Sequence, residues 1–221
     1  MEITLESDLV LLRPIQESDA EELWANTAGD DQLWNWVWTA EPIPRSLEDI
    51  RSVIKAMKVR DAQGIRNTFA VVLKSSGQVI GSTSYIDRDE VKKSLEIGST
   101  FYAAFARRTA VNTHCKYLLL THAFEVLRYQ RVLIKADSTN TTSIAAITRI
   151  GAKLEGLIEH EKQRRDGSWR DAVYFSVIES DWLETKAHLT KLLVTKAHYL
   201  KSSNNLQYYE SASDCRKARN I

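Results

Sequence analysis

The sequence is poor in cysteine. Its two cysteines, Cys115 and Cys215, lie a hundred residues apart. Neither has a partner at the spacing of a metal site or a redox motif. Likewise His114, His122 and His160 are scattered and show no metal-ligand spacing. We therefore expect reduced thiols and no bound metal.

An excess of charge of one sign is also missing. The chain has 30 basic and 29 acidic side chains, for a formal net charge of +1. Such a chain has no general attraction to a phosphate backbone or to anionic lipid. The composition therefore argues against nucleic acid and membrane surfaces as partners.

Long apolar runs are absent too. No run approaches the roughly 20 residues that are needed to span a bilayer. The first residues, MEITLESDLVLLRP, carry acids where a secretory signal would carry bases. These features predict a soluble cytoplasmic protein.

The residues that are present suffice for one main domain, because 43% of the 221 residues are apolar. The first half reads as a strand, two helices and three strands. The expected ranges are 4–13 for the strand, 19–27 and 46–60 for the helices, and TFAVVLKSSGQVIGSTSYI and SLEIGSTFY for the strands. Capping boxes begin the helices, at Ser18 with Glu21 and at Ser46 with Asp49. The three strands include a hairpin around Ser75-Ser76-Gly77.

The second half alternates helices and strands. Apolar residues recur at helical spacing over 113–127, which leaves Lys116 and Glu125 for the surface. RVLIKAD follows as a buried strand, a short helix over 143–150 stops at Gly151, and Asp166-Gly167 turns a final hairpin. The fold class is therefore α/β with a mixed sheet.

The C-terminal part differs in composition. From about Trp182 the sequence has the character of one appended helix, and the stretch SSNNLQYYESASDCRKARNI is polar. We expect a domain over residues 1–184 and a helical extension with a disordered tail over 185–221.

Two junctions could carry chemistry. At the first, a strand passes into the long helix through a loop with Arg107 and Arg108, where helix amides and two cations suit a phosphate. The alternative is a surface loop with two solvated charges. At the second, Asn140 and Ser143 follow a buried strand, either as helix-start residues or as site residues.

The order of the motifs resembles that of GNAT acetyltransferases, and most closely that of the ribosomal-protein N-terminal acetyltransferases. The motifs are EIG, RRTAVN, HAFEVL, RVLIKAD, NTTSIAAITRIGAKLEG and DGSWRDAVYFSVIESDW. The similarity covers residues 9–182. It implies a GNAT fold, in which a mixed central sheet has a splayed strand pair at the CoA site and helices on its flanks.

The resemblance also implies a coenzyme site. The CoA pyrophosphate would meet the loop formed by Arg107, Arg108, Thr109, Ala110, Val111, Asn112 and Thr113. Backbone groups near Thr100, Phe101 and Tyr102 would pair with pantetheine, and Asn140 would contact the coenzyme. Ala110 and Asn112 replace the family's small residues. Alanine is tolerated at position 110 if the backbone stays helical but costs binding if φ must be positive.

The reaction implied is direct transfer of an acetyl group from acetyl-CoA to a primary amine, either a protein N-terminus or a small molecule. Glu96 is the first candidate for the base and Glu161 the second, although both could be ordinary solvent-facing residues. Ser143 could assist the departing thiolate or serve only as a helix hydroxyl. The alternative is a CoA-binding protein with little or no turnover. The sequence is compatible with a monomer and with a homodimer.

Three tryptophans precede the hairpin. Trp34, Trp36 and Trp38 alternate as a strand or a loop would place them. They could bind the acceptor or pack in the core or a lid.

Overall fold

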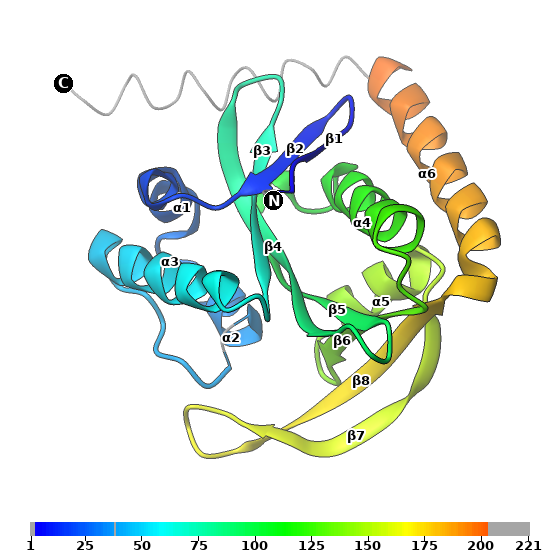
Figure 1. Cartoon of the computed structure of the whole chain (residues 1–221). Coiled ribbons are helices and arrows are strands. Elements are labelled where there is room, and N and C mark those ends of the chain that lie inside the picture. Colours follow the sequence, from blue (N-terminus) through cyan, green and yellow to red (C-terminus); the bar gives the residue numbers. More distant parts are fainter. Residues whose placement is uncertain (1–2, 38, 203–221) are drawn as a thin grey trace.

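A computed structural model describes residues 3–37 and 39–202, and these build one mixed eight-stranded sheet (Figure 1). Its spatial order is β1-β2-β3-β4-β5-β6-β8-β7. The strands are β1 (Leu5–Glu6), β2 (Val10–Pro14), β3 (Asn67–Leu73), β4 (Gln78–Asp89), β5 (Ser94–Tyr102), β6 (Arg131–Asp137), β7 (Lys153–Gln163) and β8 (Trp169–Ile178). Only β5 and β6 pair in parallel; the other neighbours within the described residues are antiparallel.

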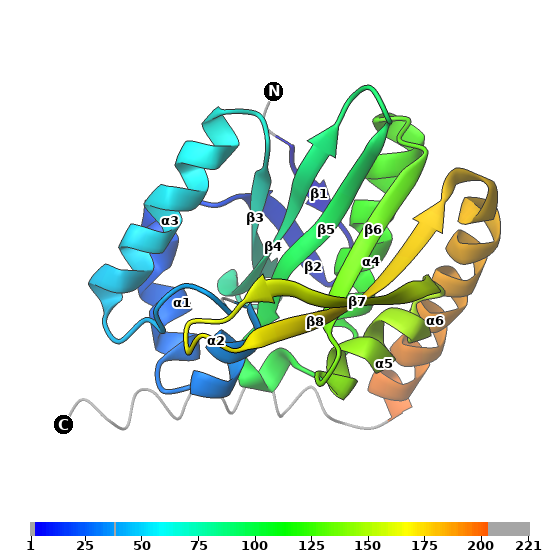
Figure 2. The same cartoon turned by 90° about the horizontal axis from the view of Figure 1, so that it is seen from below.

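Helices cover both faces of the sheet (Figures 1 and 2). One layer holds α1 (Ala20–Thr27), α2 (Asp31–Val37) and α3 (Leu47–Ala62), and the other holds α4 (Val111–Thr121), α5 (Thr141–Arg149) and α6 (Trp182–Ser202). Short 3-10 turns lie at Glu17–Asp19, Ala104–Ala106 and Glu179–Asp181. Each layer has its own hydrophobic core. The predicted α/β class with a mixed sheet is therefore confirmed. None of the helices within the described residues has the length and apolarity to cross a membrane.

The position of β3 between the two helix layers explains why its sequence, NTFAVVL, is almost continuously apolar. Phe69 and Val71 pack into the core under α4, whereas Ala70 and Val72 pack into the core under α1 and α3. Successive side chains of a strand point to opposite faces, so a central strand between two helix layers needs apolar residues on both.

The helix starts agree with the sequence in one case and differ in the other. Ser46 caps α3 by accepting a hydrogen bond from the Asp49 N–H at 3.2 Å, as predicted. At α1 the expected Ser18 box is wrong. Asp19 instead accepts from the Gln16 N–H at 2.8 Å and pairs with Arg13, so a 3-10 turn precedes the helix.

Strands β5 and β6 separate after a short paired segment. The parallel pairing runs from Ser94–Arg131 to Glu96–Leu133, yet β5 continues to Tyr102 and β6 to Asp137. On its other side, β5 stays paired with β4 as far as Tyr102. The cleft-side backbone groups of β5 beyond Glu96 are therefore left without a neighbouring strand. This is the splayed pair that the resemblance predicted.

A β-bulge accompanies the separation. Ser82 of β4 pairs with Phe101 of β5, and Ser84 pairs with Gly98. Between these two pairs β5 advances by three residues and β4 by two, so β5 holds one extra residue. The extra residue is Ser99, whose φ is 49°. A bulge of this kind exchanges the faces of the residues that follow it. Ile97 and Tyr102, five positions apart, consequently share one core.

Gly81 permits a close approach at the same place. A Cβ atom at position 81 would lie 2.1 Å from the carbonyl oxygen of Phe101. Because that neighbour is backbone, a side chain at position 81 would displace the strand segment that borders the splay.

The long helix begins and ends differently from the prediction. α4 starts at Val111, two residues earlier than expected, and continues into a π-helical turn over His122–Val126. The expected surface position of Lys116 is wrong, since this residue is 4% exposed. It faces the sheet and the splay rather than solvent.

Helix α6 packs on the layer of α4 and α5. Leu189 is fully buried in that core, and the Trp182 indole N–H donates to Glu125 at 2.8 Å. The boundary between residues 184 and 185 stays a prediction. The expected disordered tail begins at Ser202, which the structure places at the end of α6, and residues 203–221 lie outside the described residues.

Candidate active site

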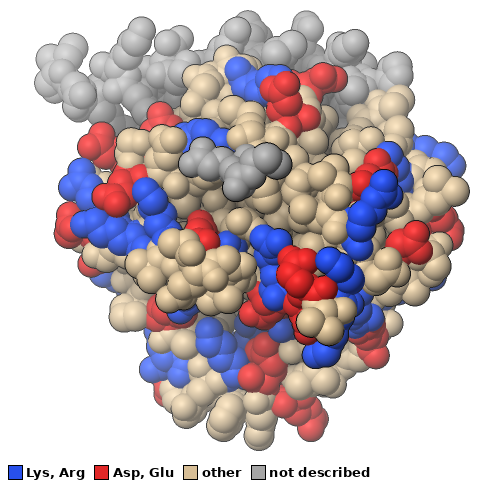
Figure 3. Space-filling model, viewed as in Figure 1, with Lys and Arg blue, Asp and Glu red and all other residues tan. Residues whose placement is uncertain are grey.

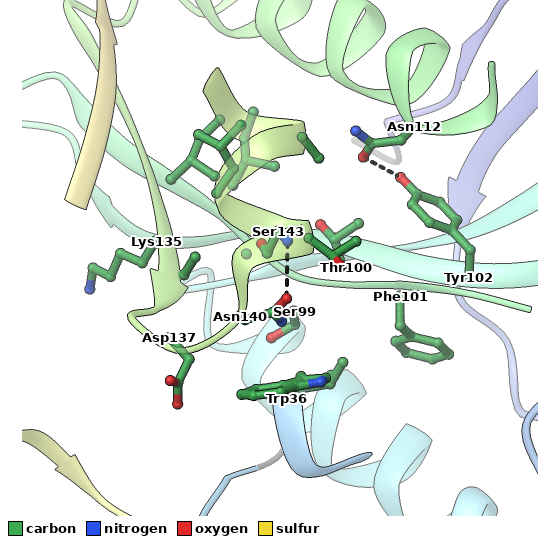
Figure 4. A pocket seen from close by; sticks show the side chains of 18 of the residues that line it. Trp36, Ser99, Thr100, Phe101, Tyr102, Asn112, Lys135, Asp137, Asn140 and Ser143 are labelled. Atoms are coloured by element: carbon green, nitrogen blue, oxygen red, sulfur yellow. Dashed lines mark hydrogen bonds between the residues drawn. The ribbon is translucent and has the colours of Figure 1, made fainter. Parts of the chain in front are cut away.

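A cleft of about 1100 Å³ opens where β5 and β6 separate, beside the N-termini of α4 and α5 (Figure 4). It collects residues that are far apart in the sequence. Of the residues predicted to form the site, Glu96, Thr100, Phe101, Tyr102, Arg107, Arg108, Thr109, Asn112, Asn140 and Ser143 line it. The cleft is also lined by Trp36, Asp87, Lys135, Glu161 and Arg170.

Three predicted loop residues lie behind the cleft surface. Ala110, Val111 and Thr113 are buried. Ala110 has φ −75° and ψ −14°, so its backbone is helical and alanine is unstrained there. The positive φ, 60°, falls on Arg108 instead. The replacement of glycine by Ala110 therefore creates no backbone strain in this loop.

Arg107 is anchored within the protein. Its guanidinium forms an ion pair with Asp30 and donates from Nε to the carbonyl of Tyr102 at 2.9 Å. Asp30 immediately precedes α2, and Tyr102 ends β5. Arg107 consequently ties the loop before α4 to both elements while it lines the cleft.

The N-terminus of α4 borders the cleft, where Asn112 of its first turn is a lining residue. The first intrahelical hydrogen bond runs from the His114 N–H to the Ala110 carbonyl at 3.0 Å, so the amides before it have no carbonyl partner one turn back. Of these, the Val111 N–H donates to Thr109 Oγ1 at 3.2 Å. The Tyr102 hydroxyl donates to Asn112 Oδ1 at 3.1 Å and fixes that side chain at the rim (Figure 4). This end of the cleft suits an anion.

Asn140 and Ser143 meet at the start of α5. Asn140 Oδ1 accepts a hydrogen bond from the Ser143 N–H at 3.0 Å, so Asn140 is the N-cap (Figure 4). The structural role considered for Asn140 is therefore present. The cap uses the backbone of Ser143 and not its hydroxyl, which lines the cleft.

The two candidate bases share one cation. Glu96 is 8% exposed, and Lys135 Nζ lies 2.8 Å from its Oε2. Burial raises the pKa of Glu96, and the positive charge of Lys135 partly opposes this rise. Glu161 is 3.9 Å from Lys135 and 3.8 Å from Arg170. A carboxylate with a raised pKa that faces a cleft is suited to accept a proton near neutral pH.

Five cationic residues that line the cleft were not predicted from the sequence, namely Lys116, Lys135, Arg149, Lys162 and Arg170. Lys116 Nζ donates to the hydroxyl of Thr100 at 3.1 Å, and burial lowers its pKa to about 8. Arg149, at the end of α5, donates to Thr113 Oγ1 at 3.1 Å, and burial lowers its pKa. The position of Lys116, four residues after Asn112 on one helix, was the available signal. Arg149 had no such signal.

The predicted strand or loop around Trp34 and Trp36 is wrong. Residues 31–37 form helix α2, because Leu33, Trp34 and Val37 recur at helical spacing. Trp34 is 1% exposed and its ring centroid lies 5.2 Å from that of Phe101. Trp36 lines the cleft, and Trp38 lies outside the described residues. Within the described ranges, no three potential metal ligands gather into a cluster.

Comparison with known proteins agrees with this architecture. Residues 10–153 match the model of the acetyltransferase (GNAT) domain. The chain is 30% identical over 179 residues to YdaF of Bacillus subtilis (strain 168), whose name provisionally assigns it as a ribosomal N-acetyltransferase. The alignment covers 78% of this chain and 93% of that protein.

Solved structures show the same fold. A GCN5-related N-acetyltransferase from Brucella melitensis superposes with a TM-score of 0.79 at 26% identity, covering 86% of this chain and 84% of that one. Mycobacterium smegmatis RimJ in complex with CoA-disulfide superposes with a TM-score of 0.74 at 20% identity, covering 88% and 94%. The chain belongs to the GNAT family of acetyltransferases, as the sequence motifs predicted. It is a GNAT N-acetyltransferase family enzyme.

Proposed function

We propose that this enzyme transfers the acetyl group of acetyl-CoA directly to the α-amine of a protein N-terminus, with both substrates bound in one cleft. The observation that carries the proposal is the splay of β5 from β6. It opens a cleft with free strand amides, two helix N-termini and a buried carboxylate.

The coenzyme end of the cleft fits the parts of acetyl-CoA. Amides at the start of α4, together with Arg108, would hold the pyrophosphate. The edge of β5 from Thr100 to Tyr102 has no neighbouring strand on the cleft side and would hydrogen-bond with the pantetheine amides, although the Tyr102 carbonyl already accepts from Arg107 Nε. Asn140 would contribute its remaining side-chain N–H groups. The helical backbone at Ala110 favours a competent coenzyme loop over a degenerate one.

The chemistry needs a proton acceptor and a stabilised leaving group. An α-amine with a pKa near 8 has to lose a proton before it attacks, which Glu96 would accept directly or through water. The Ser143 hydroxyl would donate to the departing thiolate. Cys115 is fully buried and its pKa is raised to about 12, so it is unsuited to carry the acetyl group. Direct transfer follows.

The acceptor is inferred from two sources. The name of the similar B. subtilis protein refers to ribosomal N-acetylation. In addition, the cleft is lined by Trp36 and by the carboxylates of Asp87, Glu96 and Glu161. Lys135 pairs with Glu96 and Arg170 lies near Glu161, so Asp87 is the carboxylate that would favour an incoming ammonium group. The free amine of an extended N-terminal segment would meet Asp87, and its first side chains would meet the ring of Trp36.

A peptide panel tests the function. Acetyl-CoA and enzyme would be incubated with peptides that have a free N-terminus, the same peptides with a blocked N-terminus and an internal lysine, and small amines. We expect release of free CoA thiol and an acetyl mass on the free α-amine only. Acetylation of lysine or of a small amine alone would overturn the acceptor assignment. Coenzyme binding without transfer to any amine would favour the CoA-binding alternative.

A further inference from the structure

Three lysines line the cleft, namely Lys116, Lys135 and Lys162, and their surroundings differ. Lys135 Nζ is 2.8 Å from Glu96, and Lys162 Nζ is 3.9 Å from Glu41. Lys116 is buried at 4% exposure and its ammonium donates to a neutral hydroxyl, that of Thr100. None of the ion pairs among the described residues includes Lys116.

These surroundings set the availability of each amine. Burial lowers the pKa of Lys116 to about 8. Burial lowers the pKa of Lys135, but Glu96 and Tyr174 together outweigh burial, and the pKa of Lys135 is raised. A lysine that loses its proton near neutral pH is a nucleophile, whereas an ion-paired ammonium is not.

The position of Lys116 on α4 brings its amine to the part of β5 where the coenzyme would bind. Its side chain leaves α4 one turn after Asn112 and ends at Thr100, on the part of β5 that has separated from β6. Thr100 is itself held by the Thr83 hydroxyl at 2.7 Å. The amine therefore lies at the wall along which, on the proposed function, the pantetheine and its thioester run.

We propose that Lys116 is an internal acetyl acceptor, and that the enzyme acetylates its own Lys116 Nζ when acetyl-CoA is bound without an amine substrate. The inference rests on the proposed function. The unprotonated Nζ attacks the thioester carbonyl, the new N–C bond forms and the C–S bond breaks. Nitrogen loses one proton and the sulfur leaves as thiolate, which takes up a proton to give free CoA.

Acetylation of Lys116 would lower the activity of the enzyme by weakening coenzyme binding. An acetylated Lys116 is neutral and larger, so it loses its charged hydrogen bond to Thr100 and fills space that the coenzyme needs. Acetyl-CoA affinity should fall at least tenfold in the modified protein. Enzyme held with acetyl-CoA but no acceptor would then lose activity with time.

Mass spectrometry of the full chain tests this directly. The protein would be incubated at pH 8 with acetyl-CoA labelled in the acetyl group and digested, and occupancy measured at Lys116, Lys135, Lys162 and the exposed Lys92. We expect Lys116 to be labelled at least tenfold faster than Lys135. Its rate should saturate with acetyl-CoA, and should be suppressed by free CoA and independent of protein concentration. Protein unfolded in urea should lose this preference.

Lys92 reports ordinary chemical acetylation, because its side chain is 80% exposed. Labelling of Lys116 that does not saturate, or that CoA leaves unchanged, would be of this chemical kind and would overturn the inference. Lys116→Arg and Lys116→Gln should abolish the acetyl mass on that peptide, and the coenzyme affinity that each variant has at the start should not fall during long incubation.

Calorimetry with acetyl-CoA separates the two claims. Binding with an unmodified Lys116 would overturn the inference and leave the proposed function standing. An absence of binding would overturn both. Because the main measurement uses the wild-type chain, poor folding of a variant would not affect the result.

Discussion

Lys135 holds Glu96 in an ion pair of 2.8 Å at a point where Glu96 is nearly buried. Burial drives the pKa of this carboxyl upward and Lys135 restrains the rise. The proton affinity of the candidate base is therefore set by a residue of the neighbouring strand, across the point where β5 and β6 separate.

Lys135→Met should move the pH dependence of the enzyme. With the cation removed, the pKa of Glu96 rises further, so a higher pH is needed to ionise the base. We expect the acidic limb of kcat/KM to shift upward by about one unit, measured with a saturable peptide acceptor. Lys162→Met, a change in the same cleft beside Glu41, is the control and should leave that limb in place. An unchanged limb in Lys135→Met would remove Glu96 as the base.

Ser143→Ala should separate catalysis from stability. If the hydroxyl assists the thiolate, kcat falls by roughly 10–10⁴-fold while acetyl-CoA affinity is kept. Stability should change by less than about 0.5 kcal/mol, because the cap oxygen belongs to Asn140. Asn140→Ala is the matched control and should cost about 1 kcal/mol. A normal kcat in folded Ser143→Ala would contradict the assignment.

Lys116→Met should stabilise the protein at neutral pH. The pKa of Lys116 is lowered on folding, from its ordinary value to about 8, so below pH 8 both states are protonated and folding buries the charge. As pH rises from 8 to about 10.5, the unfolded chain binds more protons and the wild type gains stability. We expect the variant to be more stable by about 1–3 kcal/mol at pH 7, with the difference shrinking toward pH 10.

Urea denaturation at several pH values measures this difference. Lys135→Met serves as the comparison, since it leaves Glu96 buried without its partner and should destabilise the protein. A constant difference between Lys116→Met and the wild type at all pH values would mean that Lys116 is not held as described.

Leu189→Ala should reveal how far α6 belongs to the folded unit. Leu189 is fully buried, and truncation of a core leucine to alanine costs about 2–5 kcal/mol. Leu183→Ala on the same helix is the control, since Leu183 is 81% exposed and should change stability by less than about 0.5 kcal/mol. Equal, small effects would support the boundary predicted after residue 184.

The order of elements was readable from the sequence because their local signals are strong. The cap at Ser46, the Asp166-Gly167 turn and the apolar period of α4 each depend on residues close together in the chain. The segment 31–37 misled because a tryptophan at every second position mimics a strand. Its helical period appears only when Leu33 and Val37 are counted with Trp34.

The site was less accessible to sequence reasoning. The bulge at Ser99 and the burial of Lys116 arise from contacts between elements, and no local pattern encodes them. The pairing of Glu96 with Lys135 depends on the register of β5 against β6. The resemblance to the family identified the residues of the coenzyme loop. The ion pair of Arg107 with Asp30 could not be predicted, because the fold brings these distant residues together.

The ion pair of Arg107 with Asp30 connects the loop before α4 to the segment before α2. Arg107 belongs to the proposed coenzyme loop, and Asp30 precedes helix α2, which carries Trp36, a residue that we propose contacts the acceptor. A pyrophosphate that attracts Arg107 competes with Asp30 for the same guanidinium, so occupancy at one end alters the restraint at the other. On the proposed function, binding of the two substrates would then be thermodynamically linked, and the apparent KM of each would depend on the concentration of the other.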